Sequence, residues 1–386
     1  MNITNFKWGC GNYRILVLDE RHSTTFVKKM DLDPKEIFFL NMHTLTIYIF
    51  PLIKFILKKI MKRDPSIKNI KAVYLLSIID AVNPSFIFSA IDNNKNYWCL
   101  KNHYPRKRVF LFQNALRGVT ELKARERLYL DEKKFEVDHV FTMTEIEREW
   151  YIKSGLNVTQ THACGSIKSN EIDLSSGAQD STLVYLLQYK HHDYVNPDQQ
   201  SSRYLNERGE FLSYEEIYGK NIFVLRVLED FCKKNSIEFK VFGRAKDDDT
   251  AAEECAYLRH LGFGHIDYIF KTTEVETYQY LDKTGFIVTL SSTLGHEMLS
   301  RGKPVFFWGI QHWAGKDQIF GYGQFGVRGE FWTIDLDLDS VGPLLSRFVA
   351  YTASDWSGFY QKYATVILPL DTKNIRFNQV LQRAMS

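Results

Sequence analysis

The sequence has few cysteines, and their spacing gives no sign of pairing. Five cysteines are scattered over 386 residues, and no two of them form a Cys-x-x-Cys pair. Disulfide-stapled domains and zinc sites both need closely spaced cysteines, so the pattern argues against both classes. We therefore expect a chain that works in a reducing compartment.

An excess of charge of one sign is also missing. The 49 lysines and arginines nearly balance the 46 aspartates and glutamates, which leaves a net charge of +3. Such a balance indicates no strong preference for polyanions, so we expect no nucleic-acid partner. The first residues lack the apolar core of a secretory signal, and we expect a cytoplasmic protein.

Long hydrophobic runs are few. Leu45–Met61 alone approaches a membrane helix, but it contains Pro51 and Lys54 and is too short to span a bilayer. We expect the end of a strand followed by an amphipathic helix. Packing of this helix against its own domain is favoured over lying on a membrane, and both interpretations stay open.

Apolar residues are abundant and are arranged in short runs. Hydrophobic residues make up 45% of the chain and aromatic residues 15%, and the length predicts two domains. Apolar runs alternate with helical segments, and polar residues follow each run. The runs include Tyr13–Asp19, Phe86–Ile91, Val109–Phe112, His139–Met143, Leu183–Leu187, Glu238–Phe242 and Phe286–Leu290. This alternation predicts an α/β protein with parallel sheets.

A polar, serine-rich stretch, Asp173–Ser181, divides the chain. We therefore predict two Rossmann-like domains facing across a cleft, residues 1–175 and 180–386. The last helix is expected to pack back on the first domain.

The most informative stretch is Phe286–Gly309, which predicts a strand, a tight turn, a short helix and a second strand. Ser291, Ser292 and Thr293 are good helix caps, and a helix N-terminus at a strand end offers N–H groups to anions. Gly295 would let a ligand approach the backbone closely. Glu297 does not fit the spacing of a capping box, and its structural alternative is an ion pair with Arg301 on the helix face.

Several motifs together resemble a known class of enzyme. The turn Ser291–Glu297 followed by Gly302-Lys303-Pro304 resembles the GT-B glycosyltransferases. Three more motifs narrow the resemblance to bacterial surface-carbohydrate biosynthesis proteins, which are similar to Kdo transferases. These motifs are Ile91-Asp92-Asn93-Asn94, Phe112-Gln113-Asn114-Ala115-Leu116-Arg117 and Cys164-Gly165-Ser166-Ile167-Lys168-Ser169-Asn170. The sequence departs from the pattern at Ala115 and His296.

The resemblance implies a donor site in the second domain. Ser291, Ser292, Thr293 and Gly295 would lie at the donor phosphates, and Glu297 at the ribose. Lys190 and the strand-end pair Gly243-Arg244 could complete the site with positive charge, although a surface ion pair would equally explain Arg244. Asp247–Asp249 does not follow a strand directly, so a solvated loop is favoured over a metal site. We expect neither a metal nor a cofactor.

The catalytic carboxylate is predicted in the first domain. Asp92 ends the apolar run Phe86–Ile91 and could act as base or nucleophile, although Asp92-Asn93-Asn94 could equally be a turn. The predicted acceptor or sugar-binding residues are Asn93, Asn94, Gln113, Asn114, Arg117 and Ser166.

The function predicted from these residues is transfer of a sugar from a nucleotide-activated donor to a growing surface glycan. The resemblance makes CMP-Kdo one candidate donor, and the acceptor would be a glycan or a lipid-linked glycan. The alternatives are a nucleotide-sugar epimerase and a non-catalytic carbohydrate-binding assembly subunit. A basic group, Lys101, Arg106, Lys107 and Arg108, could bring the first domain to the inner membrane.

Overall fold

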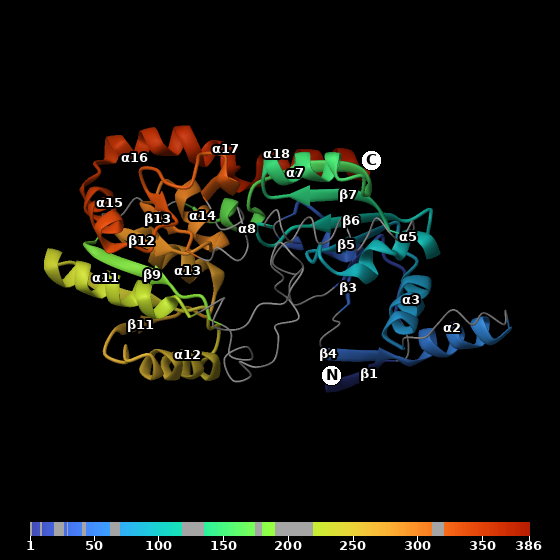
Figure 1. Ribbon diagram of the computed structural model, residues 1–386. Coiled ribbons are helices and arrows are strands. Elements are labelled where there is room, and N and C mark those ends of the chain that lie inside the picture. Colours follow the sequence, from blue (N-terminus) through green and yellow to red (C-terminus); the bar gives the residue numbers. More distant parts are fainter. Residues whose placement is uncertain are drawn as a thin grey trace. The chain divides into compact units, whose positions relative to one another are not determined.

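Two units make up the chain, and each is built on its own sheet (Figure 1). The computed structural model describes residues 2–7, 10–18, 27–28, 30–40, 44–61, 70–117, 135–173, 180–189, 219–310 and 320–386. Unit 1 contains Met1–Leu116, Arg125–Glu171 and Asp371–Ser386, and unit 2 contains Arg117–Ala124 and Ile172–Leu370. Most of unit 1 therefore comes from the first part of the chain, and its last helix comes from the C-terminal residues, after unit 2.

The sheet of unit 1 has six parallel strands in the order β3-β2-β5-β6-β7-β8. Their bounds are β2 Ile15–Leu18, β3 Ile37–Leu40, β5 Phe86–Ser89, β6 Arg108–Phe112, β7 Glu136–Thr142 and β8 Asn157–Ala163. The helices of this unit are α2 Ile49–Met61, α3 Ile70–Val82, α4 Lys95–Trp98, α5 Leu100–His103, α7 Glu145–Lys153, α8 Ile167–Asn170 and α18 Ile375–Met385. A short parallel pair, β1 Asn2–Lys7 with β4 Thr44–Tyr48, lies outside the main sheet.

The core of unit 1 explains why these runs become strands. Parallel strands are buried on both faces, so they need near-continuous apolar residues. Phe86, Phe88, Phe110 and Phe112 all point into one cluster, which also contains Phe377, Leu381 and Met385 of α18. The last helix of the chain is therefore part of the core of unit 1.

The sheet of unit 2 also has six parallel strands, in the order β11-β10-β9-β12-β13-β14. Their bounds are β9 Thr182–Leu186, β10 Glu238–Phe242, β11 Asp267–Ile269, β12 Phe286–Thr289, β13 Val305–Trp308 and β14 Trp332–Thr333. The helices are α11 Asn221–Asn235, α12 Asp248–His260, α13 Glu274–Lys283, α14 Thr293–Ser300, α15 Leu338–Ala350, α16 Ala353–Phe359 and α17 Thr365–Ile367. The predicted α/β class with two Rossmann-like sheets is confirmed.

The strand orders show where each sheet is suited to bind a ligand. In unit 2 the order reverses between β9 and β12, and in unit 1 it reverses between β2 and β5. Doubly wound sheets bind ligands beyond the carboxyl ends of the strands at such reversal points. The residues that follow β9 and β12, and those that follow β5, are therefore the first places to look for a site.

Candidate functional site

At the reversal point of unit 2, a hydrogen bond joins the ends of the two strands. The side-chain amide of Gln188, just after β9, donates to Oγ of Ser291, just after β12, over 3.3 Å. The carbonyl of Gln188 accepts from Nδ2 of Asn221 at 2.8 Å, which ties the same point to the start of α11. Polar groups from three elements thus meet beyond these two strand ends, and we call this region the β9–β12 crevice.

The start of α14 faces this point as the sequence predicted. Ser292 is the N-cap, and its Oγ accepts from the Leu294 N–H at 3.2 Å. Its own N–H donates to Oγ1 of Thr289 at 3.0 Å, which fixes the turn between strand and helix. Ser291, Ser292 and Thr293 are all partly exposed. Partial exposure at the positive end of a helix suits binding of an anion.

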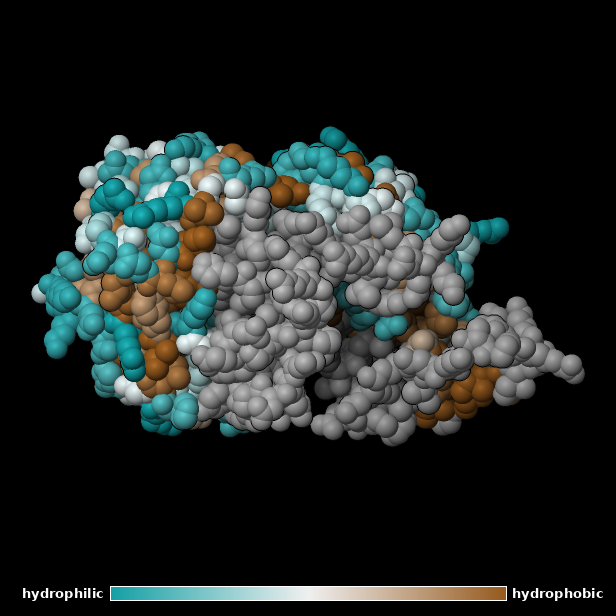
Figure 2. Space-filling view, viewed as in Figure 1, coloured by the Kyte–Doolittle hydropathy of each residue, from teal (hydrophilic) through white to brown (hydrophobic). Residues whose placement is uncertain are grey.

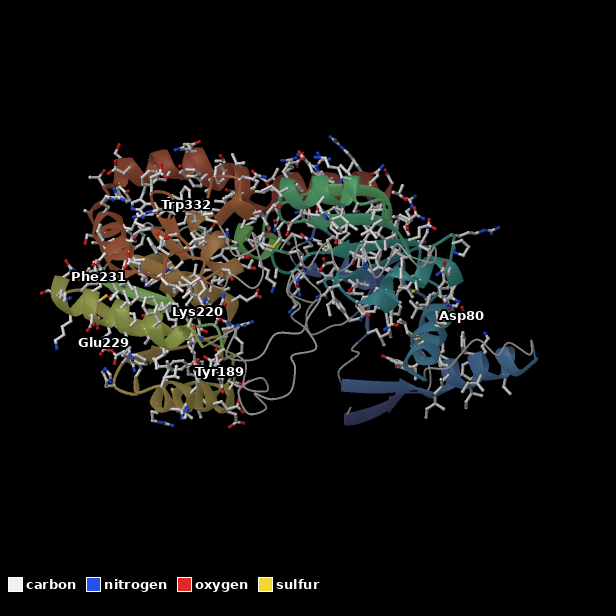
Figure 3. The ribbon with its side chains drawn as sticks, in the orientation of Figure 1. Asp80, Tyr189, Lys220, Glu229, Phe231 and Trp332 are labelled. Carbon is white, nitrogen blue, oxygen red and sulfur yellow. The ribbon has the colours of Figure 1, made fainter. Side chains whose placement is uncertain are left out.

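A cation that the sequence analysis did not select lies at the same edge. Nζ of Lys220 donates to the carbonyl of Ile310, just beyond β13, at 2.9 Å. Partial burial lowers the pKa of Lys220. Figure 3 labels it together with Tyr189, whose ring stacks on Tyr257 at 4.4 Å. The sequence offered only a weak signal, a lysine immediately before a helix. The predicted cation Lys190 lies outside the described residues.

Gly295 has a packing role, and its predicted place at the donor stays a prediction. A Cβ at this position would lie 2.6 Å from Cγ2 of Thr289, and the residue is buried. The missing side chain lets α14 sit directly on the end of β12.

His296 lies in the first turn of α14 as a neutral imidazole. Its Nδ1 lies 3.1 Å from the Ser292 carbonyl, so this nitrogen carries the proton and donates to the oxygen. The ring stacks against Phe320, with centroids 6.0 Å apart. Burial lowers the pKa of His296 to about 4, so the ring adds no positive charge to the helix start at neutral pH.

Glu297 is buried, and its contacts differ from those of a helix-surface residue. Only 6% of Glu297 is exposed, and Tyr278 donates its hydroxyl to Oε2 at 2.8 Å. Arg301 is buried as well and forms a bidentate pair with Asp282, at 3.1 and 2.5 Å. Glu297 and Arg301 are thus both buried, and neither lies on an exposed helix face. Burial, followed by the charge of Glu297, raises the pKa of Tyr278 far above its usual value.

The strand-end pair Gly243-Arg244 is shaped by a buried carboxylate. Oε2 of Glu254 accepts the Arg244 N–H at 3.0 Å and the Tyr268 hydroxyl at 2.6 Å. A Cβ on Gly243 would lie 2.2 Å from the same carboxylate oxygen. Burial raises the pKa of Glu254 in spite of these hydrogen bonds. Arg244 is exposed, unlike the Glu254 carboxylate that binds its N–H, so its guanidinium is available to an anion.

Asp247–Asp249 starts a helix and is not a solvated loop. Asp247 is the N-cap of α12, and its carboxylate accepts from the Thr250 N–H at 2.8 Å. Asp248 and Asp249 occupy the first turn, where negative charge is favoured by the helix dipole. Capping accounts for this acidic run.

In unit 1, Asp92 follows β5 at the reversal point, but not directly. The strand ends at Ser89, so Ala90 and Ile91 intervene, and the predicted strand Phe86–Ile91 was too long. Asp92 and Asn93 form a turn, and the Asp92 carbonyl accepts from the Trp98 indole at 2.7 Å. The turn alternative therefore describes the backbone, while the Asp92 side chain is fully buried.

The neighbouring asparagines differ from Asp92. Asn93 is exposed, so it can reach a ligand. Asn94 is the N-cap of α4 and accepts from the Asn96 N–H at 3.0 Å, which gives it a structural role.

Gln113 links the carboxyl ends of β6 and β7. Its Oε1 accepts from the Met143 N–H at 2.9 Å, and its own N–H donates to the Phe141 carbonyl at 3.0 Å. Its Nε2 is buried and has no hydrogen-bond partner among the described residues. An unpaired buried amide costs about 1–3 kcal/mol, so this group is suited to an incoming oxygen. Asn114 beside it is partly exposed, whereas Arg117 is buried and groups with unit 2 rather than unit 1.

The segment Gly165–Asn170 anchors the returning C-terminus. Ser166 caps α8 by accepting from the Ser169 N–H at 3.3 Å. Nδ2 of Asn170 donates to Oδ1 of Asn374 at 2.9 Å, and Nδ2 of Asn374 donates to the Ile167 carbonyl at 2.9 Å. Ser166, predicted to bind sugar, is thus a buried helix cap.

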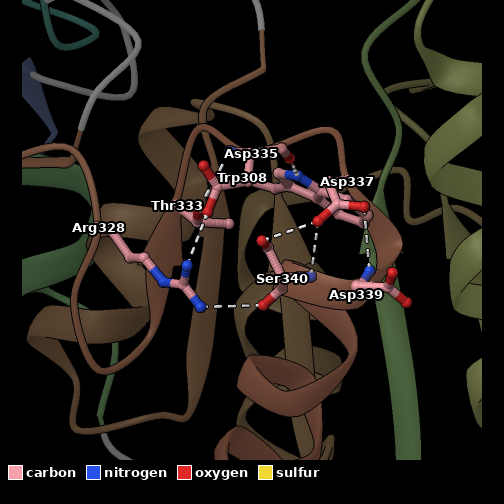
Figure 4. A network of polar contacts seen from close by, with 7 residues as sticks. All are labelled: Trp308, Arg328, Thr333, Asp335, Asp337, Asp339 and Ser340. Carbon is pink, nitrogen blue, oxygen red and sulfur yellow. Dashed lines mark hydrogen bonds and ion pairs between the residues drawn. The ribbon is translucent and has the colours of Figure 1, made fainter.

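A network of polar contacts joins the carboxyl ends of β13 and β14 to the start of α15 (Figure 4). Trp308, at the end of β13, donates its indole N–H to the Asp335 carbonyl at 2.7 Å. Arg328 pairs with the Asp335 carboxylate at 3.3 Å, and Asp337 caps α15. These contacts occupy the strand ends beyond β13, which leaves the β9–β12 crevice as the candidate donor site.

A pocket among the described residues is lined by residues of neither reversal point. It measures about 310 Å³, and Phe50, Pro51, Lys54 and Phe55 of α2 line it together with Cys10 and the α3 residues Ser77, Asp80 and Ala81. None of the predicted site residues borders it.

Two doubly wound parallel sheets with polar groups at their reversal points define the GT-B-like class of α/β proteins. Residues 110–385 match the model of a family described as "putative O-antigen biosynthesis protein", and the chain belongs to this family. The surface-carbohydrate part of the predicted resemblance is confirmed, while the similarity to Kdo transferases stays a prediction. A search of curated proteins found no match.

Solved structures match over nearly the whole chain at low identity. A "putative UDP-N-acetylglucosamine 2-epimerase" from Listeria monocytogenes has 12% identity and a TM-score of 0.54, with 97% of each chain covered. The UDP-GlcNAc 2-epimerase of Methanocaldococcus jannaschii, in complex with UDP-GlcNAc and UDP, has 10% identity and a TM-score of 0.52, covering 97% of this chain and all of its own. The wall teichoic acid polymerase TagF, soaked with CDPG, has 8% identity and a TM-score of 0.50, covering 96% of this chain and 88% of its own. At these identities the likeness concerns the fold.

Proposed function

We propose that this protein transfers a sugar from a nucleotide-activated donor to a growing surface glycan. One observation carries the proposal: in a chain of an O-antigen biosynthesis family, a partly exposed helix start and a polar crevice coincide at the reversal point of unit 2. Anionic groups of a nucleotide are bound well by such a place without a metal ion.

Each donor-site residue has a distinct role in this proposal. Ser291, Ser292 and Thr293 offer hydroxyls to the phosphates at the positive end of α14, and Arg244 and Lys220 supply positive charge, with Lys190 as a further cation. Glu297, whose Oε2 accepts from the Tyr278 hydroxyl, would meet a ribose hydroxyl. Gly243 and Gly295 contribute through packing, since both hold their strand ends close to a neighbouring element.

Unit 1 would supply the acceptor side. Asp92 is the proposed base or nucleophile, because it follows β5 at the reversal point of unit 1, where doubly wound sheets bind their ligands. Asn93, Asn114 and the unpaired amide of Gln113 are suited to sugar hydroxyls. The acceptor would be a glycan or a lipid-linked glycan, met at the inner face of the membrane.

A nucleotide-sugar epimerase is the second candidate. It is favoured by the solved structures of UDP-GlcNAc 2-epimerases, which cover at least 97% of this chain at TM-scores above 0.5. An epimerase would convert the nucleotide sugar with no acceptor present, whereas a transferase needs one. A non-catalytic assembly subunit would bind the nucleotide sugar and turn over neither substrate.

A thermal-shift screen with UDP, CDP, CMP and GDP tests the donor site, because a bound nucleotide raises the melting temperature by mass action. CMP would also report on CMP-Kdo as donor. Ser291→Ala should lower the shift caused by the best nucleotide, since it removes a hydroxyl from the crevice. Ser346→Ala is the matched control, because Ser346 lies on the exposed side of α15 and bonds only within its helix. Equal shifts in both variants would rule out the β9–β12 crevice.

The catalytic part is tested in the same preparation. Asp92→Asn should abolish sugar transfer and keep the nucleotide-induced shift, since donor binding is assigned to unit 2. Turnover that persists in this variant, with the right donor and acceptor supplied, would remove Asp92 from the mechanism. Conversion of the donor without acceptor by the wild type would favour the epimerase.

A further inference from the structure

Helix α2 has two apolar faces, and the fold covers only one of them. Pro51 and Phe55 are buried, and both line the pocket shared with α3. Phe50, which also lines this pocket, is 60% exposed, and further round the helix Ile53 is 49% exposed, Ile56 41% and Leu57 54%. Figure 2 shows the resulting hydrophobic surface, coloured brown, over this helix. The expectation that α2 packs on its own domain is thus correct for one face only.

The exposed side chains form one continuous stripe. Phe50, Ile53 and Leu57 recur at the spacing that places residues on one side of a helix, and Ile56 borders them. Four of the large exposed hydrophobic residues of the described chain gather on these two turns. A stripe of this kind in water signals a surface that is covered in use.

The charge of α2 has one sign. The helix contains Lys54, Lys58 and Lys59 and no acidic residue, and Lys54 is exposed. Lys62 and Arg63 follow directly in the sequence. Asp80 of α3, labelled in Figure 3, is the acid nearest to this helix in the pocket, and the Tyr104 hydroxyl binds it at 2.8 Å.

The basic group that the sequence offered for membrane contact is mostly engaged elsewhere. Nζ of Lys101 pairs with Asp138 at 2.8 Å, and Nζ of Lys107 donates to Asn83 at 2.6 Å. Arg108 donates to the Ala384 carbonyl at 2.8 Å and lies over the ring of Phe86. These contacts help to hold unit 1 together, so a membrane contact through this basic group stays a prediction.

We propose that α2 docks unit 1 on an anionic lipid bilayer. The stripe of Phe50, Ile53, Ile56 and Leu57 enters the boundary between headgroups and acyl chains, and the lysines lie among the headgroup phosphates. No described helix is long and apolar enough to cross a membrane, so α2 lies in the plane of the surface.

Charge decides between a bilayer and a second copy of the chain. A symmetric dimer through α2 would bring the lysines of both copies together, and the helix has no acidic residue to offset them. An anionic bilayer supplies both the apolar interior and the opposite charge. The inference extends the lipid-linked acceptor of the proposed function, but it does not need turnover to be tested.

Vesicle flotation of the full chain tests the proposal. Wild-type protein should float with phosphatidylglycerol-containing vesicles and much less with phosphatidylcholine vesicles, and salt should weaken the binding. Ile53→Ser/Leu57→Ser should lose most of it. Ile152→Ser on α7, at a position of 59% exposure, is the matched control and should bind as wild type. Lys54→Gln should reduce binding to the anionic vesicles only.

Three results would overturn the proposal. Equal binding to both vesicle types would remove the charge argument, and undiminished binding of the double variant would remove the stripe. If the wild type is a dimer that binds no vesicles, and Ile53→Ser/Leu57→Ser is a monomer, then the stripe is covered by a second copy of the chain. The nucleotide-induced thermal shift should be the same in all these variants, so loss of docking is distinguishable from failure of the donor site.

Discussion

At the scale of single residues, the main result concerns polar side chains that look alike in the sequence. Ser166, Ser292 and Asp247 are of the types that bind sugars, phosphates or metals, and each turns out to cap a helix. The same hydroxyl or carboxylate can serve either purpose, and only its neighbours decide which. Position at a strand end could therefore be predicted, but the role of each residue could not.

A histidine pair in unit 1 predicts a pH dependence of stability. Nδ1 of His139 lies 3.1 Å from Nε2 of His162, and His139 stacks on Phe110. Burial, with the charge of His162 second, lowers the pKa of His139 to about 4, and burial lowers that of His162. In the unfolded chain each histidine takes up a proton near pH 6.5, whereas the folded protein resists protonation down to lower pH. The pair therefore contributes fully to the free energy of unfolding above pH 6.5. Its contribution is lost as the pH falls from 6.5 towards 4.

Denaturant unfolding at pH 7.5 and pH 5 measures this loss. His139→Phe keeps the stacking on Phe110 and removes the ionisation, so it should flatten the decrease between the two pH values. The control is His260→Gln, since His260 is exposed on α12. A decrease as steep in His139→Phe as in wild type would assign the effect to other groups.

At the scale of elements, the contact between α14 and β12 depends on Gly295. Gly295→Val should destabilise unit 2 by about 1–3 kcal/mol, because its side chain would be forced against Cγ2 of Thr289. Thr289→Ser removes that methyl group and keeps the Oγ1 that accepts from Ser292. The double variant should therefore recover part of the loss, as measured by thermal unfolding.

Gly342 supplies the matched comparison. It lies inside α15, and a Cβ there would meet nothing within 4 Å. Gly342→Ala should stabilise the protein by about 0.5–1 kcal/mol, since alanine favours a helix interior. Equal effects at Gly295 and Gly342 would show that close packing of α14 is not what excludes a side chain.

The elements themselves were largely predictable, because short apolar runs followed by polar residues are typical of parallel strands. Their order in each sheet was not, since every run of this kind is equally suited to any central position. The reversal points, and with them Gln188 and Lys220, follow from that order. Neither residue could be selected before the neighbours of β9 were known.

At the scale of the whole molecule, the return of the chain to unit 1 depends on two asparagines. Asn374 has φ +52°, and its side chain joins Asn170, Ile167 and Glu171. Asn374→Ala should leave buried groups unpaired at a loss of about 1–3 kcal/mol and loosen α18. Limited proteolysis should then cut near Leu370–Ile375 sooner than in wild type.

Lys373→Gly tests the left-handed backbone of this turn. Lys373 is exposed and has φ +58°, so glycine should relieve strain and keep α18 docked. Faster cleavage in Lys373→Gly than in Asn374→Ala would show that the turn, and not the asparagine side chains, holds the helix.

The same connection has a consequence for synthesis on the ribosome. Nearly all of unit 2 is one continuous segment, residues 172–370, so this unit can fold as soon as the segment has emerged from the ribosome. The core of unit 1 needs Phe377 and Leu381, which are among the last residues made. The unit that is begun first is therefore completed after unit 2, and its sheet stays partly uncovered until α18 has been made.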